Sequence, residues 1–307
     1  MTSLNYAGRS DMKRRIPTIL LYAGFGLAVL VLLAMIKFPW PVLAGRLTST
    51  VNASGVVRLS YLVATPSCFP PGLVLEGVAL TSAQDPDTPL FTASRVRLTP
   101  AWLSFLVGKT GVKLRAEAYG GELRGRITAD GITSPENFVV DLSLDDLDLS
   151  RHPQLAEQAG AQGLLSGRIS LAGPLSGSQA LLGNADLAVT SGAARYKSDF
   201  LTRDVVRLGK VQADLTWLNG RLGVERLAMA EGDLQGELKG SFQPGQGGKP
   251  LSGGKLTVDG SLLVEPSLLH LDKIPDRSIA DRLRRKEPLH PKWNGPVAPL
   301  VGLAGML

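Results

Sequence analysis

Residues 112–131 read VKLRAEAYGGELRGRITADG, and this stretch determines the class of fold. On both sides of the pair Gly120-Gly121, apolar side chains stand at every second position: Val112, Leu114, Ala116, Ala118, Leu123 and Ile127. A period of two is typical of a β-strand with one face turned to a core. Two adjacent glycines tolerate the positive φ angles of a tight turn. The stretch therefore predicts a β-hairpin whose strands share one apolar and one charged face.

The same alternation continues in both directions along the chain. It appears in residues 72–80 (GLVLEGVAL) and again in residues 211–218 (VQADLTWL). Turn signals, of which Asn219-Gly220 is the strongest, recur every ~8–12 residues, as in all-β proteins. We therefore expect a mainly β fold, in which residues 37–265 form a long, curved, open antiparallel sheet with one or two short helices.

The helices expected beside this sheet are too few to cover its apolar face. Only residues 100–107 and residues around 198–208 have a helical pattern in this region. The sheet must therefore curl over itself, dimerise, or hold something apolar in its groove. The candidate contacts for an apolar ligand, a phospholipid above all, are Leu73, Leu75, Val112, Leu114, Leu123, Ile127, Leu215 and Trp217.

An uncharged apolar segment, residues 16–36, lies near the N-terminus. As a helix it would be about 31 Å long, the thickness of the hydrocarbon core of a bilayer. Lys13, Arg14 and Arg15 precede it directly. Positive residues stay on the cytoplasmic side of a membrane, so the sequence predicts a cytoplasmic tail over residues 1–15, a single transmembrane helix, and an extracytoplasmic sheet domain.

Two aromatic residues, Phe38 and Trp40, follow the apolar segment. Amphipathic rings favour the membrane–water interface, so these residues are the candidate outer-interface anchors. A cleaved signal peptide is the alternative interpretation. The apolar segment is longer than such a peptide requires, and it lacks a good small-residue cleavage site. An uncleaved anchor with the lipid bilayer as its partner is the preferred prediction.

The charge distribution argues against a nucleic-acid partner. The net charge is +6, but much of the excess flanks the apolar segment, where it relates to membrane orientation. Cys68 is the only cysteine, so an internal disulfide is excluded, and we interpret it as a small buried apolar residue.

No motif with catalytic or cofactor-binding chemistry is present. The sequence lacks a phosphate-binding Gly-rich loop, H-E-x-x-H, C-x-x-C and G-x-S-x-G. The acidic residues of 141–148 alternate with apolar ones as in a half-exposed strand, although calcium binding there is an alternative. We therefore expect neither catalysis nor a cofactor or metal.

The C-terminal stretch, residues 266–307, differs from the rest. Residues 278–286 (SIADRLRRK) predict a short basic helix, and several prolines follow it. We expect this extension to pack on or near the sheet.

The order of these segments resembles a known family. The basic N-terminus, the single apolar span, Phe38-Pro39-Trp40, PPGLVLEGVAL (70–80) and RLTPAWLSFLVGKTGVKLRAEAYGGELRGRI (97–127) resemble type II secretion system protein N (GspN). The recurring G-x-L-x-G, as in residues 121–125, also resembles AsmA-like proteins. The resemblance implies a single-pass protein of the bacterial inner membrane with a periplasmic domain.

Two functions follow as hypotheses. The resemblance to protein N implies a non-catalytic accessory or structural role in type II secretion, with other inner-membrane subunits of that pathway as partners. The AsmA-like character implies a periplasmic lipid-binding or lipid-transfer protein that uses the apolar sheet face. A continuous apolar groove favours the lipid role, whereas a filled groove favours the structural one.

Overall fold

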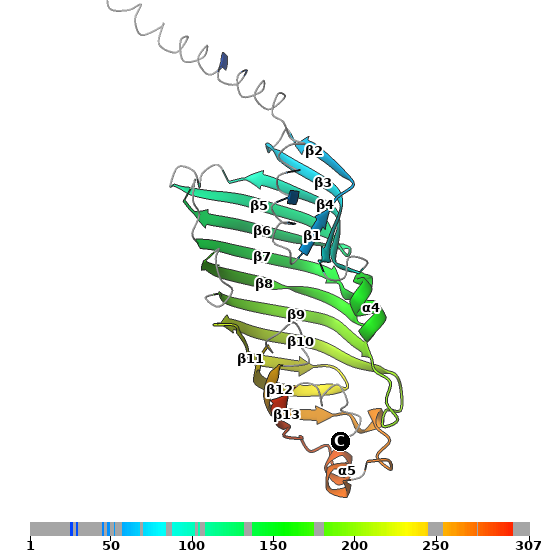
Figure 1. The fold of residues 1–307 in the computed structure, drawn as a ribbon. Helices are drawn as coiled ribbons and strands as arrows, with labels where there is room; N and C mark the ends of the chain where they lie inside the picture. Colours follow the sequence, from blue (N-terminus) through cyan, green and yellow to red (C-terminus); the bar gives the residue numbers. More distant parts are fainter. Residues whose placement is uncertain are drawn as a thin grey trace, which may run out of the picture.

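The computed structural model describes residues 57–67, 70–83, 88–101, 108–131, 137–174, 181–244, 254–274 and 276–296, with a few isolated residues outside these ranges. Within them the chain is mainly β, as predicted, and forms one long, open, antiparallel sheet of 14 strands (Figure 1).

Several sequence predictions fall outside this part of the chain. The charged triplet, the aromatic anchors and Cys68 lie outside the described residues, as does nearly all of the segment 16–36. Among the described residues, no helix is both long enough and apolar enough to cross a membrane.

The strands follow the alternation of the sequence closely. They are β1 (Val57–Ser60), β2 (Val63–Ser67), β3 (Gly72–Ser82), β4 (Pro89–Pro100), β5 (Lys109–Ala118), β6 (Gly121–Asp130), β7 (Asn137–Asp148), β8 (Gln162–Pro174), β9 (Leu182–Arg195), β10 (Val205–Leu218), β11 (Arg221–Ala230), β12 (Leu234–Gln243), β13 (Lys255–Val264) and β14 (Lys292–Pro296). From β3 onward each strand pairs with the next in the chain, so the sheet is a simple meander.

The N-terminal edge of the sheet is the exception to this order. β2 pairs with one half of β3 and β1 pairs with the other half. The partner changes at Gly77, whose φ of 62° and close contact with the side chain of Leu62 favour glycine there. Two short strands thus cover the edge of one long strand.

The hairpin turns agree with the sequence in one case and differ by one residue in the other. Asn219 and Gly220 both have positive φ and connect β10 to β11, as predicted. In the first hairpin the turn is Tyr119-Gly120, whereas Gly121 already pairs with Ala118 in the sheet. The predicted Gly120-Gly121 turn was therefore wrong by one position.

The described helices are short and lie at the edges of the sheet (Figure 1). They are η1 (Leu149–Arg151), α4 (Pro153–Ala159), η3 (Pro266–Leu268) and α5 (Arg277–Arg284). The basic helix expected in the C-terminal stretch is α5. The prediction of a helix around 198–208 was wrong, because β10 begins at Val205 and turns precede it. Pro100 closes β4, and most of 101–107 lies outside the described residues.

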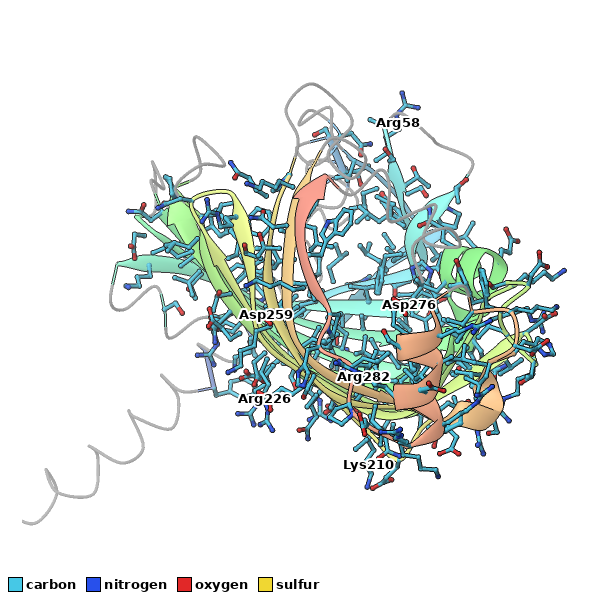
Figure 2. The ribbon with its side chains drawn as sticks, turned by 90° about the horizontal axis from the view of Figure 1, so that it is seen from below. Arg58, Lys210, Arg226, Asp259, Asp276 and Arg282 are labelled. Atoms are coloured by element: carbon cyan, nitrogen blue, oxygen red, sulfur yellow. The ribbon has the colours of Figure 1, made fainter. Side chains whose placement is uncertain are left out.

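The strands are bent, so the sheet forms a trough with an inner and an outer face (Figure 2). Arg226 and Lys210 project from the outer face in this view. Backbones approach closely at glycines such as Gly167, where a Cβ would collide with the carbonyl oxygen of Asp186.

Buried apolar residues form two clusters near the two ends of the sheet. The N-terminal cluster joins β3, β4 and β5 and includes Leu73, Leu75 and Ala116. The C-terminal cluster joins the ends of β10 and β13 to η3 and α5, and includes Leu268 and Leu283. Between these two clusters lies the candidate site.

Candidate functional site

The strand register aligns apolar residues from edge to edge across the inner face. The central row, one residue from each strand from β3 to β14, is Leu73, Leu98, Leu114, Gly125, Leu142, Ile169, Ala185, Leu215, Val224, Gly240, Val258 and Trp293. Adjacent strands lie about 4.8 Å apart, so this row is about 53 Å long.

Two further apolar rows flank the central row. On one side lie Pro100, Val112, Ile127, Val140, Leu171, Gly183, Trp217, Leu222, Phe242, Leu256 and Gly295. On the other lie Leu75, Val96, Ala116, Leu123, Leu144, Gly167, Leu187, Ala213, Leu227, Leu238 and Gly260. No charged residue interrupts the three rows.

The register therefore places all eight candidate ligand contacts of the sequence on one face. Those on β3 are almost completely buried, with Leu73 1% and Leu75 3% exposed. Those on β5 and β6 are more open, and Ile127 is 42% exposed. The candidates thus share a face but not a degree of burial.

A group of inner-face residues in the middle of the sheet stays only half-buried. This group, called the open stretch below, consists of Ile169, Leu171, Ala185, Leu215, Trp217, Leu222, Val224 and Phe242. β8, β9, β11 and β12 contain no buried hydrophobic side chain, although their inner faces are apolar. Large partly exposed apolar surfaces mark binding sites more often than they occur by chance.

The tryptophan in the open stretch has a further property. The indole Nε1 of Trp217 is shielded from solvent and has no hydrogen-bond acceptor in the described part of the chain, and the same holds for Trp293 on β14. Six of the eight residues of the open stretch were not among the sequence candidates. The period-two pattern of β8, β9, β11 and β12 was the signal that could have found them.

A buried carboxylate stabilises the C-terminal side of the open stretch. Asp233 is 1% exposed and accepts hydrogen bonds from the backbone N–H of Arg207 at 2.8 Å and from its guanidinium at 2.9 Å. Arg203 forms a second ion pair with it at 2.6 Å. Burial by itself raises the pKa of Asp233, but the hydrogen bonds from Arg207 and Arg203 and their charge outweigh it and lower the pKa.

The backbone of Asp233 joins three segments of this side. Its N–H donates to the carbonyl of Arg207 on β10, and its carbonyl accepts from the N–H of Glu265, which precedes η3. No sequence pattern indicated Asp233, because an aspartate next to a glycine is ordinarily a surface turn residue. The residue fixes the strand ends on which the C-terminal cluster packs.

Residues that could ligate a metal are dispersed over the described part of the chain. No group of three or more His, Cys, Asp or Glu side chains among them is arranged to hold a metal ion. The acidic residues of β7 instead bind neighbouring side chains, since Asp141 accepts from Ser170 at 2.7 Å and Asp146 from Ser166 at 3.0 Å.

The fold and this face define a class of protein: an open, curved, antiparallel sheet with one continuous apolar face that is half-exposed in its middle. In comparisons with known proteins, no family model, no curated protein and no solved structure matches the chain.

Proposed function

We propose that this protein is a non-catalytic lipid-binding protein that holds the acyl chains of a phospholipid against the open stretch. The observation that carries the proposal is the half-burial of an inner face that has no charge in its three rows. Each methylene group moved from water onto such a surface contributes about 0.8 kcal/mol. A ligand with long methylene chains therefore gains more binding free energy here than a compact polar ligand does.

The dimensions of the open stretch support the same ligand. It extends from β8 to β12, which is four strand spacings or about 19 Å. One leaflet of a bilayer is about 15 Å deep in its hydrocarbon part, half of the ~30 Å core. An acyl chain laid across the strands therefore fits within the open stretch.

The clusters at the two ends favour binding over free passage along the whole sheet. Leu73 and Ala116 in the N-terminal cluster are 1% and 2% exposed, so their apolar surface has no room for a ligand. Leu268 and Leu283 close the C-terminal side in the same way. We place this protein with AsmA-like lipid-binding proteins, in a form whose groove is open in the middle.

The proposed location follows from the sequence. Residues 16–36 anchor the protein in the bacterial inner membrane, Lys13, Arg14 and Arg15 keep the N-terminus cytoplasmic, and the sheet is periplasmic. A membrane-anchored sheet with an apolar face has phospholipid close by. The bilayer thus supplies both the anchor and the ligand.

Brominated phospholipids test the proposal, because bromine on an acyl chain quenches only those indoles that it contacts. The protein is the full chain with Trp217 as its sole tryptophan, the other three being replaced by Phe, in nanodiscs with brominated or ordinary lipid. We expect strong quenching of Trp217. The matched control adds Trp217→Phe and Ala188→Trp, which moves the indole to the outer face of β9, where Ala188 opposes Gln212.

The control indole should be quenched much less than Trp217. Equal quenching of the two would mean that bromine reaches the sheet without preference for the inner face. Absence of quenching at Trp217 in a folded protein would show that no acyl chain occupies the open stretch. Either result would overturn the proposed function.

A second candidate is the accessory role in type II secretion. The filled N-terminal and C-terminal clusters favour it, because a sheet that packs on itself acts as a structural element. The resemblance of the segment order to protein N supports it as well. Deleting the gene should then reduce exoprotein secretion, and restoring a variant with Leu215→Asp should rescue it. Unchanged secretion after deletion would exclude this role.

A further inference from the structure

Several positive side chains lie opposite one another on the outer face of the same sheet. Arg97, Arg115 and Arg124 lie directly opposite one another on β4, β5 and β6. Lys113 and Arg126 form a second opposed pair beside them. Like charges directly opposite each other destabilise a sheet. An arrangement that opposes folding in this way calls for a negative partner.

The protein supplies only part of that partner. Glu122 accepts hydrogen bonds from Arg124 at 2.9 Å and from Arg115 at 3.0 Å. The hydrogen bond from Arg124, followed by that from Arg115, lowers the pKa of Glu122 to about 2 despite the opposing effect of burial. Glu122 is thus shared between two guanidinium groups, and Asp145 lies 4.0 Å from Arg124 as a second, longer ion pair.

Other cations on this part of the outer face, including Arg168 on the nearby strand β8, have no ion pair in the described residues. Lys113, Arg126 and Arg168 come within ion-pair distance of no carboxylate there. Asp141 lies opposite Arg126, but its carboxylate accepts from the hydroxyl of Ser170 instead. These three cationic side chains, together with Arg97 on β4, therefore remain available to a ligand.

These side chains surround a shallow hollow of about 720 Å³ on the outer face. Its lining includes five cationic side chains, Lys113, Arg115, Arg124, Arg126 and Arg168, and two carboxylates, Asp141 and Asp186. Ser143, Ser170 and Asn184 add neutral hydrogen-bonding groups. The hollow has the volume of a small-ligand site, which favours a compact anion over a long polymer.

We infer that this hollow binds a phosphate-bearing group. The side chains of two neighbouring strands are about 4.8 Å apart and those two residues apart on one strand about 6.8 Å. Lys113, Arg115, Arg124 and Arg126 therefore present four positive groups on a small rectangle. Guanidinium forks match pairs of oxygens in carboxylate and in phosphate alike, but the additional oxygens of a phosphate-bearing group let it contact several of these cations at once. The charged side chains of the site lie on the opposite face from the open stretch, so the inference does not depend on the proposed lipid function.

Titration with inorganic pyrophosphate tests this inference, with the full chain held in nanodiscs of neutral phosphatidylcholine. We expect saturable binding that weakens as NaCl rises from about 0.05 M to about 0.5 M, because salt screens exposed charges. Lys113→Gln with Arg126→Gln should weaken binding by about tenfold or more, since two charge-assisted contacts are lost.

The chain offers a control with the same change in charge. Arg226 and Lys239 also lie on the outer face, but both sit near Glu237, at 3.6 Å and 3.8 Å. Arg226→Gln with Lys239→Gln should leave pyrophosphate binding within about twofold of wild type, because no charge-assisted contact to the ligand is lost. If both double variants lost the same affinity for pyrophosphate, the overall charge of the protein would explain the binding. The proposed site would then be wrong.

A variant that is expected to bind pyrophosphate more tightly shows whether misfolding explains the weaker binding of the other variants. Glu122→Gln removes the internal competitor for Arg115 and Arg124, so it should tighten pyrophosphate binding several-fold. Glu237→Gln is its control and should not. Loss of function through misfolding cannot mimic tighter binding.

A second titration, with added vesicles that contain phosphatidylglycerol, distinguishes the sources of the phosphate. Binding of pyrophosphate that responds to these variants identifies a soluble phosphate ligand. Binding of the anionic vesicles alone, with the same response, identifies a lipid headgroup. If wild-type protein binds neither probe, the inference is wrong.

Discussion

The N-terminal part of the sheet and the open stretch have the same apolar pattern but bury it to different degrees. Leu73 on β3 is 1% exposed, whereas Leu215, in the same inner-face row on β10, is only half-buried. The N-terminal part is covered by residues from β1 and the segment after it, such as Leu59 and Tyr61. Alternation thus determines which face is apolar, and distant segments determine whether it is covered.

The largest expected effect comes from truncating one leucine in each region. Leu73→Ala should lower the free energy of unfolding by about 2–5 kcal/mol, the range for fully buried leucines. Leu215→Ala should cost about 1 kcal/mol in lipid-free protein, because a half-exposed side chain loses less burial and leaves no closed cavity. Urea unfolding of both variants measures the difference. Equal losses of unfolding free energy in the two variants would mean that the two regions are equally packed and do not differ in burial.

Lipid offers a way to sharpen the same comparison. If acyl chains cover the open stretch, added phospholipid should increase the cost of Leu215→Ala and leave that of Leu73→Ala unchanged. A ligand stabilises the folded state in proportion to its binding, so the midpoint of unfolding should rise with lipid concentration in wild type. A midpoint independent of lipid concentration would contradict the proposed function.

The second-largest expected effect concerns the C-terminal side of the sheet, where the buried carboxylate of Asp233 holds strand ends together. Asp233→Asn should cost about 1–3 kcal/mol, because hydrogen bonds to the charged carboxylate are lost while the group stays buried. Asp259→Asn, an exposed outer-face residue on β13, is the matched control and should change little. Comparable losses in both would show that Asp233 does not join the segments around it.

The pH dependence of this effect has a definite sign. Because the pKa of Asp233 is lowered in the folded state, its charge stabilises the protein at every pH above the ordinary aspartate pKa of about 3.9. That contribution disappears as the pH falls through the lower, folded-state pKa. The difference in Tm between wild type and Asp233→Asn should therefore be constant near neutral pH and shrink below about pH 4. A difference that grew in acid would exclude this mechanism.

Much of the fold was predictable from the sequence because it depends on local patterns. The period of two in residues 112–131 located β5, β6 and their shared face, and Asn219-Gly220 located the turn between β10 and β11. The first turn was shifted by one residue, because Tyr119 adopts the positive φ that the prediction reserved for glycine. The rule that glycine takes the positive-φ position of a turn failed here, because a tyrosine took that position.

Contacts between segments distant in sequence could not be predicted. The segment 198–208 resembles a helix by its spacing, but Val205 and Val206 pair with Arg195 and Ala194 of β9, and strand pairing overrides the local preference. The burial of Asp233 depends on Arg203 and Arg207, which are 30 and 26 residues away. The half-exposure of the open stretch likewise depends on how far segments distant in sequence cover it.

The smallest expected effect on the free energy of unfolding comes from the outer face, where removing one carboxylate in each region tests whether the two regions differ there as well. In each, a carboxylate lies between two cations: Glu122 pairs with Arg115 and Arg124, and Glu237 lies near Arg226 and Lys239. Asp145 is a further, more distant partner of Arg124 at 4.0 Å. The cations of both groups are exposed to solvent, which weakens the ion pairs, so Glu122→Gln and Glu237→Gln should each cost at most about 1 kcal/mol, less at high salt. The low pKa of Glu122, about 2, keeps its contribution intact above about pH 4.3 and removes it only in stronger acid. Similar small losses would confine the difference between the regions to the inner face, since the outer faces would then respond alike. A much larger loss for Glu122→Gln would instead show that repulsion among the opposed arginines is a major term in the stability of the N-terminal part.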